Sequence, residues 1–193
     1  MKVLHVDSSI LGDNSASRVL SREIVSKLSA KHPDAEVKYL DLAAAELPHL
    51  SGRSLAKLDA DESALSASTL DDFLAADVIV IGAPMYNFTI PTQLKAWIDR
   101  VVVAGKTFRY TQSGPEGLAK GKRVIVGLSR GNVYAPGSPA DFAESYLKHV
   151  FGFIGVSDVE FIRADGLGLS PEHREKGMKA ALTAIHEPVA AAA

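Results

Sequence analysis

The segment from Gly82 to Pro91 contains the side chains best suited to hold a planar ligand. It reads Gly-Ala-Pro-Met-Tyr-Asn-Phe-Thr-Ile-Pro and so combines turn-forming residues with aromatic and amide groups. Aromatic rings stack on flat ligands, and an amide can both donate and accept hydrogen bonds. The chemistry expected here is the binding of a flat aromatic molecule, and the candidate contacts are Met85, Tyr86, Asn87 and Phe88.

A second segment, from Asp7 to Arg18, is dense in hydroxyl-bearing and small residues and leads into a predicted helix. Backbone N–H groups at a helix N-terminus, assisted by short hydroxyl donors, can surround an anion, and the helix dipole favours negative charge there. We predict a phosphate site whose contacts are Ser9, Ser15, Ala16 and Ser17. The alternative is that Asn14 or Ser15 only caps the helix, a role that is compatible with anion binding.

A third segment satisfies the pattern G-x-S-x-G around Ser129 and raises the hypothesis of a serine hydrolase. Asp165, His173 and His186 could complete a triad in chain order. A nucleophile elbow turns from strand directly into helix, however, whereas a loop is expected here. The alternative is a ligand-binding loop in which Gly131 lets the backbone approach a ligand closely. Its candidate contacts are Ser129, Arg130, Gly131 and Asn132.

Five strand-like segments alternate with helical ones, and this rhythm positions the three candidate segments. We expect strands at residues 2–7, 36–41, 77–82, 123–129 and 156–164, and helices at residues 16–31, 91–104, 139–151 and 171–186. The pattern predicts an α/β fold, a flavodoxin-like doubly wound sheet of five parallel strands in the order 2-1-3-4-5 with helices on both faces. Ligands in such a sheet bind beyond the carboxyl ends of the strands.

Several other features of the chain carry expectations. Residues 42–76 form a longer excursion than the usual connection, and we expect one or two helices there. In the helix expected at residues 91–104, Trp97 is expected to pack, whereas Lys95, Asp99 and Arg100 are expected on the solvated or interface side. His5 is expected to be a core or edge histidine. The alanine-rich tail, residues 188–193, is expected to fray.

Composition excludes several classes of function. The 193 residues fit one domain, and 21 basic against 23 acidic residues give no field that would favour nucleic acid. The absence of Cys excludes disulfides, thiolate metal sites and cysteine nucleophiles, and fits a reducing cytoplasm. No signal peptide, membrane span, dinucleotide fingerprint or metal-ligand pattern is found in the sequence, so neither a membrane nor a metal is an expected partner.

Taken together, the three segments resemble the flavin-contact segments of FMN-dependent NAD(P)H:azoreductases. The resemblance continues through residues 94–100, 107–111, 114–118 and 152–155 and covers nearly the whole chain apart from residues 42–76 and the tail. It implies a flavodoxin-like homodimer that holds FMN non-covalently. The phosphate would lie in the loop from Ser9 to Ser17, and the ring would lie against residues 85–88 and 129–132. It also implies an aromatic substrate cleft, partly from the other subunit, built from Phe88, Tyr110, Tyr134 and Phe153.

The activity implied by this resemblance is a ping-pong reductase. Hydride would pass from NADH or NADPH to FMN and then to an azo compound or a quinone, with no obligatory catalytic side chain. The proton would come from solvent, Tyr110 or Tyr134. No Arg cluster for a ribose phosphate is visible, which favours NADH, although Arg53 and Lys57 lie in the excursion.

Two observations qualify the resemblance. Residues 42–70 form a shorter segment than in the relatives, and Asn132 and residues 134–137 depart from their pattern, which leaves the substrate range and the nucleotide preference open. A flavodoxin-type electron carrier is the alternative function for the same fold. Carriers rely on charged docking faces, which the near-neutral charge of this chain does not favour.

Overall fold

The computed structural model describes residues 1–45 and 47–185. Five parallel strands form one sheet in the order β2-β1-β3-β6-β7. Taken in chain order, these parallel strands follow the expected order 2-1-3-4-5, so the predicted doubly wound topology is confirmed. The strands are β1 (Lys2–Asp7), β2 (Glu36–Asp41), β3 (Val78–Pro84), β6 (Arg123–Ser129) and β7 (Asp158–Ala164).

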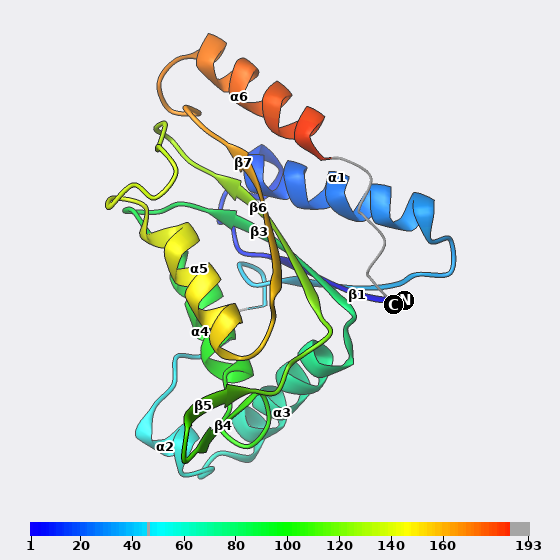
Figure 1. Cartoon of the computed structure of the whole chain (residues 1–193), viewed down its shortest axis with the longest axis vertical. Helices are drawn as coiled ribbons and strands as arrows, with labels where there is room; N and C mark the ends of the chain where they lie inside the picture. The colour runs from blue at the N-terminus through cyan, green and yellow to red at the C-terminus, as the bar shows by residue number, and fades with distance from the viewer. Residues whose placement is uncertain (46, 186–193) are drawn as a thin grey trace.

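Helices cover both faces of this sheet, as Figure 1 shows. One face carries α1 (Ala16–Lys31) and α6 (Pro171–Ala184), which lie side by side. The other face carries α3 (Ala60–Ala75), α4 (Thr92–Val101) and α5 (Phe142–Phe153). Among the described residues, no helix combines the length and the apolar character needed to cross a membrane.

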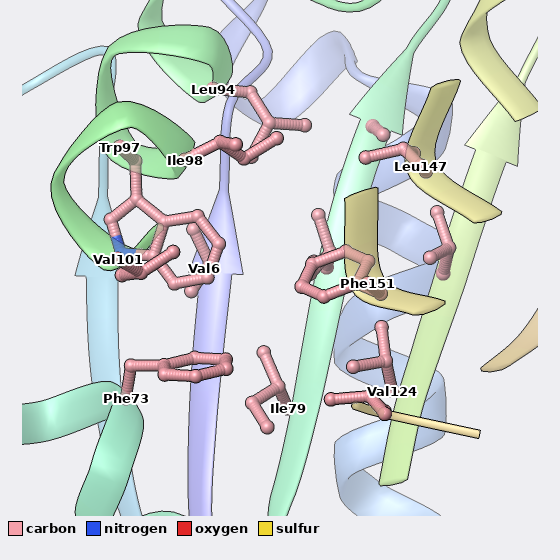
Figure 2. Packing of buried hydrophobic residues seen from close by; sticks show 14 of the residues in the cluster. Val6, Phe73, Ile79, Leu94, Trp97, Ile98, Val101, Val124, Leu147 and Phe151 are labelled. Carbon is pink, nitrogen blue, oxygen red and sulfur yellow. The ribbon is translucent and has the colours of Figure 1, made fainter. Parts of the chain in front are cut away.

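The core lies on both faces of the sheet because β3 and most of β6 are buried on each side. On the α3–α4–α5 face, Trp97 and Phe73 meet edge to face with ring centroids 6.0 Å apart, as expected for packing aromatics. Figure 2 shows their side chains beside Val6, with Phe151 packed over the neighbouring strands. On the α1–α6 face, the smaller cluster includes Leu20 of α1. Continuous β-branched runs such as β3 are typical of strands covered on both sides.

Several element bounds differ from the sequence prediction for local reasons. Helix α4 begins one residue later because Pro91 is its N-cap, and it ends at Val101. Helix α5 begins at Phe142 because the Asp141 carboxylate accepts hydrogen bonds from Ala143 and Glu144 and so fixes the N-terminus there. Strand β7 starts two residues later than expected.

An antiparallel hairpin, β4 (Phe108–Thr111) with β5 (Gly114–Gly117), was not predicted as strands. Each of its strands is only four residues long, too short for a periodicity signal. A short 3-10 helix, η1 (Gly12–Asn14), also interrupts the loop after β1.

The excursion at residues 42–76 contains two helices, α2 (Gly52–Leu55) and α3, as expected. Arg100 holds this excursion to α4 and corrects one expectation. Its guanidinium is buried and donates to the Ser66 hydroxyl at 2.7 Å, to the Glu62 carboxylate at 3.0 Å and to the carbonyl of Pro48. The expectation that Arg100 lies on a solvated or interface side was wrong because the excursion of the same chain folds over it. The tail expected to fray lies outside the described residues.

Candidate functional site

The three candidate segments meet at the carboxyl edge of the central strands. Parallel pairing places Gly82 of β3 opposite Asp7 of β1 and Pro84 of β3 opposite Ser129 of β6. Beyond the strands, the Ser8 hydroxyl donates to the Gly82 carbonyl at 2.8 Å, and the Met85 N–H donates to the Ser129 carbonyl at 2.8 Å. The sheet therefore joins the three segments at the switch point where such folds bind ligands.

Two glycines in the sheet let helix α1 approach this edge closely. A Cβ at Gly82 would lie 2.2 Å from the Asp7 carboxylate and 3.1 Å from the Ser17 carbonyl, and one at Gly127 would lie 2.8 Å from Cβ of Leu20. Distances below 3.0 Å are not found for real Cβ atoms. Only residues without a side chain allow the first turns of α1 to lie this close to β3 and β6.

The loop after β1 brings its serine hydroxyls together at the start of α1. Ser9, Ser15 and Ser17 are buried, and the hydroxyls of Ser15 and Ser17 lie 3.1 Å apart. Ser15 is also the N-cap of α1, because its hydroxyl accepts a hydrogen bond from the Arg18 N–H at 3.3 Å. The N–H groups of Ala16 and Ser17 belong to the first helical turn and have no intrahelical partner. Capping and an anion-binding donor set thus coexist in this loop.

Arg18 completes this loop from below and was missed as a site residue. Its Nε and Nη2 donate to the Ser9 carbonyl at 3.3 and 2.8 Å. Its Nη1 and Nη2 donate to the two oxygens of Asp41 at 2.6 and 2.7 Å. This hydrogen bond lowers the pKa of Asp41 and raises the pKa of Arg18 from their usual values. Arg18 ends the hydroxyl-rich segment, but Asp41 lies in a different element, and no sequence signal indicated that the two residues pair.

The same polar cluster extends to Asp7 at the end of β1. Asp7 accepts hydrogen bonds from the Ser21 hydroxyl at 2.7 Å and from the Tyr39 hydroxyl at 3.1 Å. Burial and the nearby Asp7 charge raise the pKa of Tyr39 to about 12, so Tyr39 stays neutral. His5 is buried, with Nε2 3.5 Å from the Asp7 carboxylate, which agrees with the expected core histidine.

The candidate segment from Gly82 to Pro91 contains a tight turn, residues 86–89, with an unusual backbone. The Tyr86 N–H donates to the Thr89 carbonyl at 2.9 Å, and the Thr89 N–H donates back at 3.1 Å. Asn87 and Phe88 lie between them with φ of 47° and 71°. Asn tolerates the left-handed region, whereas a bulky aromatic residue there is strained. The Phe88 side chain is 55% exposed, so burial does not offset this strain. The turn thus presents an aromatic ring to solvent.

Tyr86 connects this turn to the predicted phosphate loop. Its hydroxyl lies 3.3 Å from Oγ of Ser9 and accepts a hydrogen bond from the Ile10 N–H at 3.3 Å. Two of the three candidate segments are therefore in direct contact through one side chain.

The third segment is fixed by the buried side chain of Arg130. Its Nε and Nη2 donate to Asp165 at 2.5 and 2.8 Å, and its Nη1 donates to Asp141 at 2.5 Å. The Tyr134 ring lies 5.4 Å from the guanidinium carbon. The Arg130 side chain is thus occupied by hydrogen bonds within the protein. A Cβ at Gly131, by contrast, would meet nothing within 4 Å. Of this segment, Gly131 and Asn132 are exposed, whereas Ser129 and Arg130 are buried.

The geometry does not support a serine hydrolase. Ser129 is the last residue of β6, and residues 130–141 form a loop before α5, so the chain does not turn from strand into helix as a nucleophile elbow does. His173 lies in the first turn of α6, where its Nδ1 is hydrogen-bonded to the hydroxyl of the N-cap residue Ser170 at 2.9 Å. His186 lies outside the described residues.

The predicted aromatic cleft is not assembled within one chain. The Phe142 N–H donates to the Phe88 carbonyl at 3.0 Å, which places the start of α5 beside the turn. Phe153 lies at the other end of α5, about 16 Å along the helix axis. Phe108 contacts both Phe153 and Tyr110, with centroids 4.7 and 5.5 Å away. Figure 1 shows the β4–β5 hairpin well away from the loops that follow β3 and β6.

These features define an α/β protein of the doubly wound class, with a hydroxyl-lined helix N-terminus and an aromatic turn at its switch point. The chain belongs to the family described as having a flavodoxin-like fold, which matches residues 1–189.

Proteins similar to this chain are named as redox enzymes. An FMN-dependent NADH:quinone oxidoreductase of Stenotrophomonas maltophilia (strain K279a) is 53% identical over 195 residues, covering 100% of both chains. One of Rhizobium meliloti (strain 1021) is 54% identical over 198 residues, covering 97% of this chain and 96% of that protein. A solved azoreductase of Bacillus anthracis (strain Sterne) is 30% identical, with a TM-score of 0.85 and 96% of each chain covered.

Proposed function

We propose that this chain is an FMN-dependent NADH:quinone oxidoreductase that also reduces azo compounds. The observation that carries the proposal is the convergence of a hydroxyl-lined helix N-terminus and an aromatic turn at one sheet edge, where the Tyr86 hydroxyl contacts the Ser9 loop. The names of the similar proteins support the same activity. The cysteine-free sequence fits a cytoplasmic location.

The residues present fit FMN. Its phosphate requires several donors, and Ser9, Ser15, Ser17 and the N–H groups of the first turn of α1 supply them. Its ring system requires a flat, partly apolar wall, which residues 85–88 and 129–132 supply. When bound, FMN supplies the hydride chemistry, accepting a hydride from NADH and passing one to a quinone or azo acceptor in alternate half-reactions.

The protein's own contribution is positioning. Backbone N–H groups at the turn and at Gly131 are suited to stabilise negative charge at the polar edge of the ring. Phe88, exposed at the tip of the turn, is suited to stack on planar substrates and to exclude water. Tyr134 lies over the Arg130 guanidinium, and its hydroxyl is one candidate proton donor besides solvent.

The proposed cleft requires a homodimer. Tyr110 is 75% exposed and belongs to the β4–β5 hairpin, which lies well away from the loop after β3 in the same chain (Figure 1). Phe88 of one copy and Tyr110 with Phe153 of a second copy would complete one cleft, which gives two equivalent sites related by a two-fold axis.

The first test measures the cofactor and the reaction together. Purified protein should carry a yellow flavin whose mass after release is that of FMN. It should also oxidise NADH steadily with benzoquinone and no partner protein. A colourless protein that cannot be reconstituted with FMN would contradict the proposal. Bound FMN without steady turnover would instead favour the electron carrier.

The second test addresses the shared cleft. Phe88→Ala and Tyr110→Ala should each lower quinone reductase activity when alone. If the cleft is shared between copies, mixing and re-equilibrating the two variants restores one intact site in about four. Activity would then rise to about a quarter of the wild-type value. If the mixture is no more active than its components, the shared cleft is wrong.

A further inference from the structure

Arg18 lies beneath the phosphate loop and faces away from the ligand side. It is 8% exposed, and its guanidinium is occupied by the Asp41 carboxylate and the Ser9 carbonyl. Its Nη1 also donates to the Tyr39 hydroxyl at 3.1 Å. Arg18 therefore cannot act as a direct phosphate ligand in this arrangement, although it belongs to the first turn of α1.

The position of Arg18 is energetically unfavourable in two respects, which suggests that its contacts with the loop have a function. A cation in the first turn of a helix opposes the helix dipole, and burial of an ion pair carries a desolvation penalty. Lys95 and Asp99 of α4 show the inexpensive alternative, an exposed pair at 2.5 Å. The contact that distinguishes Arg18 is the pair of hydrogen bonds to the Ser9 carbonyl.

That contact fixes the orientation of one peptide unit. In a planar trans peptide, the carbonyl of residue 9 and the N–H of residue 10 point in opposite directions. When Arg18 holds the Ser9 carbonyl inward, the Ile10 N–H is directed outward. The Ile10 N–H does point to the ligand side, since it donates to the Tyr86 hydroxyl of the aromatic turn. The Ser9 hydroxyl lies beside the same Tyr86 oxygen.

We propose that Arg18, held by Asp41, is a positioning residue that orients the Ser9–Ile10 peptide, so that the Ile10 N–H holds the Tyr86 hydroxyl in place and the Ser9 hydroxyl faces the phosphate of the cofactor. This inference rests on the proposed binding of FMN. It assigns to a buried ion pair a role in recognising the phosphate and not the ring.

Comparison of FMN with riboflavin tests this role, because riboflavin has the same ring and lacks the phosphate. Arg18→Lys keeps the charge but cannot donate to both Asp41 oxygens and the Ser9 carbonyl at once. We expect the Kd for FMN of the apoprotein to rise roughly 10- to 100-fold, the effect of losing hydrogen bonds to a charged group. The Kd for riboflavin should change by less than about threefold. Quenching of flavin fluorescence measures both constants.

Arg100→Lys is the matched control. Arg100 is also a buried arginine on a helix, bonded to a carboxylate of Glu62 and to the carbonyl of Pro48. Its replacement should lower the melting temperature of the apoprotein to a similar extent. The ratio of the FMN and riboflavin constants should stay at the wild-type value.

Asp41→Asn provides a second test if Arg18→Lys fails to fold. The amide keeps the shape of the carboxylate but weakens its hold on Arg18, so the FMN constant should rise by a smaller factor, about three- to tenfold. Equal weakening of FMN and riboflavin, or unchanged FMN affinity in folded variants, would overturn the positioning role alone. Wild-type protein that binds riboflavin as tightly as FMN would overturn it as well. Wild-type protein that binds neither would overturn the proposed function.

Discussion

Two of the three site segments lie over a buried arginine, and the third is built differently. Arg18 holds the loop of residues 9–17, and Arg130 holds the segment of residues 129–132. The turn of residues 86–89 is closed by two backbone hydrogen bonds and carries Phe88 in the left-handed region. In the proposed function all three segments contact the cofactor that stays bound, and the turn also meets substrates that exchange.

This difference shows which segments of the site are held rigid. A segment that must present several donors to one group benefits from a fixed backbone. A buried, fully hydrogen-bonded ion pair fixes that backbone, because breaking the pair is strongly destabilising. A segment that meets different planar molecules benefits from an exposed ring. Its strain is tolerated because the neighbouring β3 and α4 fix both ends of the turn.

The largest effect on stability is expected from Arg130→Met, which removes the hydrogen bonds that Arg130 makes to Asp141 and Asp165. The change leaves Asp141 buried without its cation and removes the bidentate partner of Asp165. We expect the free energy of unfolding to fall by about 4 kcal/mol, measured by urea denaturation of the apoprotein. Arg109→Met removes the exposed pair with Glu116 and should cost far less, because exposed ion pairs contribute little to stability. Similar losses in the two variants would contradict a braced segment.

The next largest effect is expected at Gly82 of β3, which lies against Asp7 and the first turn of α1. Gly82→Ala places a methyl group 2.2 Å from the Asp7 carboxylate, which Ser21 and Tyr39 hold in place. We expect a loss of about 3 kcal/mol in unfolding free energy, at the upper end for overpacking. Thermal melting of the apoprotein measures it.

Gly131→Ala is the matched glycine control for this prediction. Its added methyl group meets nothing within 4 Å, so stability should change by about 0.5 kcal/mol or less. Affinity for both FMN and riboflavin should nevertheless fall, because the proposed contact at Gly131 is with the ring. A stable Gly82→Ala variant with wild-type FMN affinity would show that the close approach of α1 is not required.

An acid titration probes the ion pairs of Glu144, in the first turn of α5 beside Arg130. Glu144 lies 4.0 Å from Arg130, and its hydrogen bond with Arg163 lowers its pKa from 4.5 to about 2. A carboxyl with a depressed folded-state pKa stabilises the fold above its unfolded pKa, and this contribution is lost as the pH falls through the folded one.

The expected difference between wild type and Glu144→Gln is therefore about 2 kcal/mol at pH 7, discounted for the partly exposed partners. It should shrink as the pH falls from 4.5 toward 2 and vanish below that. Urea denaturation at a series of pH values measures it, with Glu116→Gln as the exposed control. A difference independent of pH would show that the ion pair is not its source.

Much of the fold could be predicted because its signals are local. Buried β-branched runs and the regular alternation of strands and helices predict a doubly wound sheet and its strand order. The motif-rich loops indicate which strand ends carry the site. The buried arginines could not be placed in this way. Arg100 was assigned to a solvated face because helical periodicity does not show what the distant residues 48–66 cover.

The site residues show the same limit. Ser9, Ser15 and Ser17 could be identified because the donors of a helix N-terminus lie together in sequence. Arg18 and Asp41 lie on different elements, and their pairing depends on tertiary structure. The separation of Phe88 from Tyr110 depends on the β4–β5 hairpin, whose strands are too short to predict.

The smallest effect is expected at the strained turn, and it has the opposite sign. Phe88→Gly removes the left-handed strain, worth about 1–2 kcal/mol, and adds backbone entropy to the unfolded chain, worth about 0.5–1 kcal/mol. Because the Phe88 ring is 55% exposed, little burial is lost. The apoprotein should gain about 1 kcal/mol, while the KM for quinone rises about tenfold through loss of stacking. Asn87→Gly, at φ 47°, should change stability by only a few tenths of a kcal/mol. If Phe88→Gly instead destabilises the protein, the turn is held by its aromatic ring, and the contrast between braced and strained segments is wrong at this point.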